Sequence, residues 1–336
     1  MKSTKRVSLI AAVLVAAMTM ATCALAAEVT LNIGFENSIT EPIGQGLQKW
    51  AELLKERSGG TMEIVLYPDS QLGSKSDLID SMLLGENVCT LANGAFFADY
   101  GVPDMGILFG PFLFTGWDQC WKLIASDWYA EQCAKLEEKG LKILASNWAY
   151  GARHLLTVKP VNKVEDLSGM KIRVPNTPIQ TTEFNVLGAS AIGMALGDVY
   201  QALQTKTIDG LENPVATLYG TKHYEVAKYL ILDAHVLDFT SWTCSKDWFD
   251  TLTEEQQTML VETGKEAGFY NSEVLLAAEE KFLQKLIDAG VKVVHPTPEV
   301  LAGFRAKAQA FYEKGSQFGW SDGLYDTVLA AMGEKK

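Results

Sequence analysis

The chain has 336 residues, of which 48% are hydrophobic, and 41 acidic against 29 basic residues give a formal net charge of −12. Such acidity argues against nucleic acid and anionic membrane surfaces as partners, but it still suits a small anion if basic side chains gather in one cleft. The length exceeds one ordinary core and predicts two lobes, and the lack of any repeat or Ser/Pro-rich tether predicts that ordinary strands join them.

The first 26 residues have the pattern of an export signal. Three basic residues precede an apolar run over residues 7–20, and Ala24-Leu25-Ala26 fits the small-x-small pattern of a cleavage site. A membrane anchor is one alternative, but the run is shorter than the roughly 20 apolar residues that span a bilayer. Lipid attachment at Cys23 is another, although the residues before it fit poorly. We predict cleavage after Ala26 and a periplasmic location, with 26 of the 29 basic residues left against 41 acidic ones, a net charge of −15.

Four cysteines follow this cleavage site, and none has the close spacing of a zinc site: Cys89, Cys120, Cys133 and Cys244. An oxidising compartment permits disulfides, and Cys120 and Cys133 are close enough in sequence to join two short helices. Free buried thiols are the alternative. We predict neither a metal nor a cofactor.

The first half of the chain alternates strand and helix patterns. Period-two alternation and apolar runs predict strands over residues 29–35, 62–67 and 87–91. Helical spacing predicts one helix that begins near Pro42 and stops at Gly59-Gly60, and another over residues 76–84. This β-α-β-α-β order implies a parallel sheet with right-handed crossovers, and such sheets bind ligands at the carboxyl ends of their strands.

The second half continues in the same style. We predict strands over residues 141–146 and 170–174 and helices over residues 179–187 and 199–205, with Asp198 as the N-cap of the latter. The segment from Thr253 to Gln256 fits a capping box. The helical pattern that follows it runs to Gly290 and would extend about 50 Å, long enough to lie across both lobes.

Two arginines and one asparagine stand out as ligands for a carboxylate. Alternation in the strand over residues 170–174 puts Ile172 and Val174 on one face and Arg173 on the other, near the carboxyl end. A planar guanidinium matches a carboxylate with two parallel hydrogen bonds. Arg153 is a second candidate, and Asn213 precedes a proline that marks a loop. On these patterns alone, surface arginines and a turn asparagine remain alternatives.

Several longer motifs surround these residues. They are Gly151-Ala152-Arg153, Lys159-Pro160, the segment Glu165-Asp166-Leu167-Ser168-Gly169-Met170-Lys171-Ile172-Arg173-Val174-Pro175, and the segment from Tyr200 to Pro214, which reads YQALQTKTIDGLENP. With Gln71-Leu72-Gly73, they resemble the solute-binding proteins of TRAP transporters, the DctP type. The similarity covers nearly the whole chain after residue 26. Lys206 departs from the pattern, because the family usually has glycine there, and we expect a surface effect only.

The resemblance implies roles for specific residues. Arg173 pairs with the substrate carboxylate, Arg153 is a second cationic contact, and Asn213 hydrogen-bonds the ligand. Further candidates come from their positions beside the expected cleft. Glu36 and Asn93 follow the first and third strands, and Asn176 lies just beyond the main arginine.

Two tryptophans near the expected lobe crossings are candidates for an aromatic wall of the site. They are Trp148 and Trp242, and ordinary core packing is an equal alternative for both. Such a wall would slightly favour a ligand with a ring or bulky tail. Dicarboxylates, sugar acids, keto acids and aromatic acids all remain open.

The resemblance implies a two-lobed α/β fold of the periplasmic-binding-protein type, with discontinuous lobes, a ligand cleft between them and the long helix across both. We expect lobe I over residues 27–148 plus about 239–268, and lobe II over residues 149–238 plus about 269–336. The function implied is capture of an organic acid anion by a monomer. The anion then passes to the small and large membrane subunits of the transporter, where an ion gradient supplies the energy.

Two other classes compete with this interpretation. One is a binding protein of another uptake or sensor system. The other is a periplasmic enzyme that acts on an organic acid, for which the sequence offers little. The four histidines show no metal-ligand spacing, and no Gly-x-Ser-x-Gly elbow or phosphate-binding glycine loop is found. We therefore predict a binding protein and not an enzyme.

Overall fold

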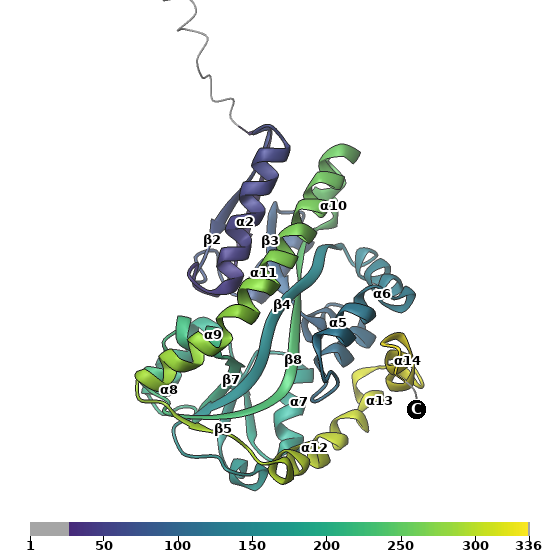
Figure 1. Cartoon of the computed structure of the whole chain (residues 1–336). Coiled ribbons are helices and arrows are strands. Elements are labelled where there is room, and N and C mark those ends of the chain that lie inside the picture. Colours follow the sequence, from purple (N-terminus) through teal and green to yellow (C-terminus); the bar gives the residue numbers. More distant parts are fainter. Residues whose placement is uncertain (1–26, 335–336) are drawn as a thin grey trace, which may run out of the picture.

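The computed structural model describes residues 27–334, so the expected export signal lies outside the described residues. One nine-stranded sheet runs through the molecule, with helices packed around it (Figure 1). Its strand order is β2-β1-β3-β8-β4-β7-β5-β6, and β9 pairs with β8. The expected two-lobed α/β fold is confirmed, because the helices pack around this mixed sheet in two groups.

The first group contains the predicted β-α-β-α-β run. Strands β1 (Val29–Gly34), β2 (Met62–Tyr67) and β3 (Val88–Ala92) form parallel pairs, with β1 between the other two. The helices of this group are α2 (Pro42–Arg57), α3 (Lys75–Leu83), α4 (Gly94–Asp99), α5 (Trp117–Ile124) and α6 (Asp127–Glu137), together with the 3₁₀ turn η1 (Pro103–Phe109).

The second group repeats the parallel arrangement around β5 (Lys171–Val174). That strand lies between β6 (Ser190–Gly193) and β7 (Gly210–Pro214), parallel to both. The remaining elements of this group are α7 (Pro178–Leu187), α8 (Val199–Gln204), α9 (Val215–Gly220) and β9 (Lys292–Val294), with the turns η2 (Val164–Leu167), η3 (Leu196–Asp198) and η4 (His223–Glu225). Asp198 is the N-cap residue of α8, as predicted, but its side chain makes no capping hydrogen bond.

Two 17-residue strands, β4 (Leu141–Thr157) and β8 (Tyr229–Ser245), connect the two groups and pair with each other in antiparallel orientation (Figure 1). The sequence predicted only residues 141–146 of β4 and missed β8. Register shifts interrupt the pairing, one of them between Ala149 and Gly151. Gly151 has φ +132°, a conformation that L side chains rarely adopt, and a Cβ there would lie 2.7 Å from Pro214. Such irregularities interrupt the alternation of apolar and polar residues by which a strand is recognised in a sequence.

The long helix α11 (Glu254–Asp288) follows the short α10 (Lys246–Phe249) and packs against α2, β4 and α9. It therefore contacts both groups, as expected, and the Thr253 capping box is present. Among residues 27–334, no helix is long and apolar enough to cross a membrane.

The C-terminal helices divide between the two groups. Helix α12 (Pro298–Tyr312) packs against α7, whereas α13 (Gly315–Phe318) leads to α14 (Leu324–Ala331), which contacts α5 and α6 (Figure 1). Leu324 and Val328 are buried in the core that also holds Leu123 and Leu136. This corrects one expectation, because burial of these side chains places the end of the tail with lobe I and not with lobe II.

All four cysteines in the described residues are free, so of the two alternatives for Cys120 and Cys133 the structure has the free thiols and not the disulfide. Cys120 lies on α5 and is fully buried in the core, whereas Cys133 is only partly buried and lines a surface hollow beside β4. Burial raises the pKa of the Cys133 thiol to about 11, which makes it a poor nucleophile at neutral pH.

Candidate ligand-binding site

A polar cavity lies where the strand ends of the two groups meet, and it has an empty volume of about 370 Å³. Five predicted site residues line it: Glu36, Asn93, Arg153, Arg173 and Asn213. The cavity is also lined by residues that the sequence did not single out: Lys75, Leu91, Phe96, Tyr150, Pro175, Gln180, Leu196, Asp238 and Thr240. The structure thus brings together residues from distant parts of the chain.

Arg173 lies next to the end of β5 and is only 2% exposed. Its Nε and Nη2 groups donate to the carbonyl oxygen of Met194, at 2.8 and 2.5 Å. Within residues 27–334, Nη1 donates no hydrogen bond and no carboxylate lies within ion-pair distance of this guanidinium. Burial lowers the pKa of Arg173 to about 10, which leaves it cationic at neutral pH. Its charge is therefore held in place and available to a ligand.

Arg153 also lines the cavity, but carboxylates already engage its charge. It forms a two-pronged ion pair with Glu212, in which Nη2 lies 2.8 Å from Oε1, and its Nη1 donates to Asp238 at 2.9 Å. Burial opposes the charged form, yet these carboxylates outweigh it and raise the pKa of Arg153. The same contacts lower the pKa of Glu212 to about 2 against the effect of burial. A ligand would meet a neutralised cluster here.

Two amide side chains carry polar atoms with no partner. Gln180 and Asn213 both line the cavity, and the Nε2 group of Gln180 and the Oδ1 atom of Asn213 are buried without a hydrogen bond to any described residue. Buried polar atoms are rarely left unpaired in folded proteins. One is assigned as a donor and one as an acceptor, so a ligand with an acidic oxygen and a hydroxyl would satisfy both.

The position of these amides explains what the sequence analysis found and missed. Asn213 lies in the buried strand β7, not in the predicted loop. Gln180 lies in the first turn of α7, after Pro178 at the helix start. The strand with Arg173 stops at a proline, and the helix begins three residues later, so the first turn of the helix lies beside Arg173. This spacing could have been read from the sequence.

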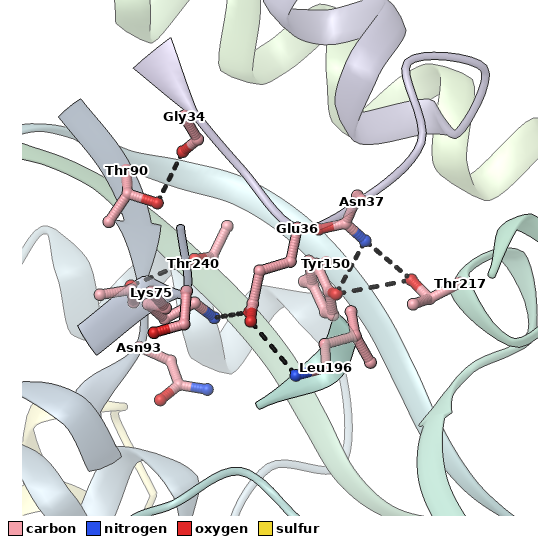
Figure 2. A network of polar contacts seen from close by, with 12 residues as sticks. Gly34, Glu36, Asn37, Lys75, Thr90, Asn93, Tyr150, Leu196, Thr217 and Thr240 are labelled. Carbon is pink, nitrogen blue, oxygen red and sulfur yellow. Dashed lines mark hydrogen bonds and ion pairs between the residues drawn. The ribbon is translucent and has the colours of Figure 1, made fainter. Parts of the chain in front are cut away.

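Glu36 connects the two groups across the cavity (Figure 2). Its Oε1 atom accepts from the backbone nitrogen of Leu196 at 3.2 Å, and its Oε2 atom lies 4.0 Å from Nζ of Lys75. Lys75 also lies over the ring of Phe96, 4.7 Å from its centroid. Burial lowers the pKa of Lys75, although Glu36 opposes this shift. Lys75 is the first residue of α3 and carried no pattern that marked it.

A second polar network beside the cavity joins the β1–α2 connection to α9 (Figure 2). Asn37 donates to the hydroxyl oxygen of Tyr150 at 2.9 Å and to Glu41 at 2.8 Å, and Thr217 donates to Glu41 at 2.9 Å. Burial raises the pKa of Glu41 to about 7 despite these bonds. Together with Glu36, this network holds the two groups against each other.

Two further predicted residues, both asparagines, lie at the cavity or beside it. Asn93 caps α4 by accepting from the backbone nitrogen of Ala95 at 3.2 Å. Asn176 lines an adjoining hollow that shares Glu36, Lys75 and Arg173 with the cavity. Both asparagines therefore remain candidates for contact with a ligand.

The two tryptophans do not line the cavity. Trp148 and Trp242 are fully buried, and their rings pack against each other and against Trp50, with centroids 5.3 to 6.3 Å apart. Trp148 also donates to the carbonyl oxygen of Gly264 on α11. This corrects the expectation of an aromatic wall, because core packing accounts for both rings.

A buried carboxyl behind the site gives a pH-dependent stability. Neither oxygen of Glu183 has a hydrogen-bond partner in the described part of the chain, and burial, aided by Glu212 and opposed by His235, raises its pKa from 4.5 to about 8. Its contribution to stability is full below the unfolded pKa near 4.5 and is lost as the pH rises through 8.

We therefore expect Glu183→Gln to gain stability relative to the parent protein as the pH rises, by up to roughly 4 kcal/mol between pH 4.5 and 8.5. The glutamine has nearly the same volume but no charge to bury. Urea unfolding at pH 5 and pH 8.5 measures the difference. A gap between the two proteins that does not change with pH would rule out this titration.

A two-lobed α/β fold with an enclosed polar cavity around one buried, unpaired guanidinium is the architecture of a solute-binding protein. Residues 33–317 match the family of bacterial extracellular solute-binding proteins, family 7 (DctP). The chain belongs to this family, whose relatives and structural neighbours are substrate-binding proteins rather than enzymes.

Individual relatives agree with this assignment. The 2,3-diketo-L-gulonate-binding periplasmic protein of Escherichia coli (strain K12) is 34% identical over 274 residues, 81% of this chain and 83% of the relative. A TRAP periplasmic solute-binding protein from Ochrobacterium anthropi, solved with bound L-fuconate, has a TM-score of 0.87 and 37% identity, over 90% of this chain and 99% of its own.

Two further neighbours indicate the state of the lobes. The protein from Xanthobacter autotrophicus PY2 with bound β-D-galacturonate has a TM-score of 0.83 at 28% identity, over 91% of this chain and all of its own. An apo open structure from Escherichia fergusonii has a TM-score of only 0.75 at 30% identity, over 90% and 99%. Because divergence is no greater in the open case, the described arrangement resembles the ligand-bound proteins more closely.

Proposed function

We propose that this protein captures a sugar acid in the periplasm and delivers it to the membrane subunits of a TRAP transporter. The buried guanidinium of Arg173, which no carboxylate of the described chain engages, carries the proposal. A carboxylate of the ligand pairs with its Nη1 group and with Nε2 of Gln180, and a neighbouring hydroxyl donates to Oδ1 of Asn213. An acid that also carries hydroxyl groups thus uses every unpaired atom described at the site.

Two relatives with sugar-acid ligands are more similar to this chain than the C4-dicarboxylate-binding relative of Rhodobacter capsulatus, which is 29% identical. The E. coli relative is named for 2,3-diketo-L-gulonate, and the two ligand-bound neighbours hold L-fuconate and β-D-galacturonate. The cavity lining is mostly polar and lacks the tryptophan wall that would favour an aromatic acid.

Binding and lobe closure depend on each other in this proposal. Glu36 and Glu41 of lobe I contact Leu196 and Thr217 of lobe II, and the ligand adds contacts to both sides. The closed monomer is then the form that the membrane subunits recognise, and those subunits couple transport to an ion gradient. The export signal expected in residues 1–26 places the protein where it meets both the ligand and these subunits.

A thermal-shift screen over carboxylic acids tests the function. At a concentration of about one hundred times its dissociation constant, a true ligand adds about 2.7 kcal/mol of stability. We expect sugar acids to give the largest shifts, and a sugar alcohol of the same chain length, such as galactitol, to give none. Mass spectrometry after incubation should recover the acid unchanged. Shifts with aromatic acids or short dicarboxylates alone would refute the sugar-acid assignment.

A further inference from the structure

The charged side chains of the cavity are paired with one exception. Five line it, and four of these form two opposite-charge pairs: Arg153 with Asp238, and Lys75 with Glu36. Arg153 is paired a second time, with Glu212. Only Arg173 has no carboxylate within ion-pair distance in the described residues. The site therefore offers one guanidinium that no carboxylate of the described residues engages directly.

We propose that this pairing makes the site selective for singly charged sugar acids, so that an aldonate or uronate binds and the aldarate with a carboxylate at both ends is rejected. The inference rests on the proposed function, in which Arg173 holds the first carboxylate of a sugar acid. It adds the charge of the far end of the ligand, on which the relatives differ, since one is named for C4-dicarboxylates and another for 2,3-diketo-L-gulonate.

The far end of the ligand must lie against one of the two pairs. A second carboxylate there would meet Glu36 or Asp238, and repulsion between like charges is strong where little water screens it. The side chains of Arg153 and Asp238 are each 4% exposed, and those of Lys75 and Glu36 are 14% and 10% exposed. A carboxylate also cannot donate a hydrogen bond to these acids.

A hydroxyl group suits the same place. It donates to the oxygen of Glu36 or Asp238 and accepts from Lys75, so both members of a pair keep a favourable contact. Burial raises the pKa of Asp238 to about 6, against the effect of Arg153, so this carboxyl is mostly ionised at pH 7.5. The negative charge that disfavours a second carboxylate is therefore largely present at the pH where binding is measured.

Matched pairs of ligands test this selectivity by calorimetry at pH 7.5. Galactonate and galactarate, gluconate and glucarate, and mannonate and mannarate differ only in whether carbon 6 is an alcohol or a carboxylate. We expect the aldonate of the best-bound pair to bind at least about 30-fold more tightly than its aldarate. Equal affinities within about threefold would overturn the inference and leave the proposed function standing, whereas a lack of binding by any sugar acid would refute both.

Glu36→Gln identifies the source of the selectivity. The amide oxygen can still accept from Leu196, but Lys75 loses its carboxylate and becomes available to the ligand. We expect the ratio of aldarate to aldonate affinity to rise at least about tenfold. Glu86→Gln is the matched control, since it removes one negative charge from an exposed loop outside the cavity and should leave the ratio unchanged. An equal change in both variants, or none in Glu36→Gln, would contradict the assigned role of this pair.

Discussion

Arg173→Ala is expected to weaken binding of the sugar acid by about 100-fold or more while leaving the fold intact. A charge-assisted hydrogen bond to a buried carboxylate contributes about 1.5–3 kcal/mol, and the variant loses the bond from Nη1 together with the positive charge beside the ligand. The fold should tolerate the change because the guanidinium bonds only the Met194 carbonyl and its burial already disfavours the charge. Calorimetry gives the affinity, and urea unfolding without ligand gives the stability.

Two further variants sharpen this result. Arg173→Lys keeps a positive charge but loses the planar, two-pronged geometry, so it should also bind weakly. Arg305→Ala is the control, because it removes an exposed arginine on α12 away from the cavity. Ligand affinity that survives in Arg173→Ala would remove the basis of the proposed function.

Local patterns in the sequence predicted the elements that position Arg173. Alternation over residues 170–174, followed by a proline, predicted a strand with Arg173 at its carboxyl end, and the structure has β5 over Lys171–Val174. The first three strands and the capping box at Thr253 were predicted in the same way. These features succeed because each depends on neighbours within a few residues.

Long-range pairing was beyond such reasoning. The partners of Arg153 lie 59 and 85 residues away, on β7 and β8, and no local pattern relates them. Strand β8 itself was missed because it is buried along most of its length and shows no clean alternation. The burial of Trp148 and Trp242 likewise depends on Trp50, a residue from a separate helix.

The contrast between local patterns and long-range contacts also applies to the two arginines of the site. Both arginines were expected to contact the ligand. The structure leaves one guanidinium unpaired and surrounds the other with carboxylates, so the two should differ in what their removal costs. Ligand affinity is the sensitive measurement for Arg173, and stability is the sensitive measurement for Arg153.

Arg153→Ala should therefore destabilise the ligand-free protein by about 3–5 kcal/mol, since it leaves Glu212 and Asp238 buried without a cation. The loss should be largest at neutral pH. In the parent protein the pKa of Glu212 is about 2, so its stabilising pair persists until the pH falls through that value. In the variant the same carboxyl has a raised pKa and is protonated in mild acid, so the gap should narrow between pH 7 and pH 5.

Urea unfolding at both pH values, without ligand, measures this effect. Arg57→Ala is a suitable control, because it breaks exposed ion pairs with Glu262 and Glu266 that contribute at most about 1 kcal/mol each. If Arg153→Ala unfolds at the same urea concentration as the parent protein but binds the acid poorly, the guanidinium contacts the ligand directly. The charge pairing that excludes dianions would then need a different account, because a second available cation would favour a second carboxylate.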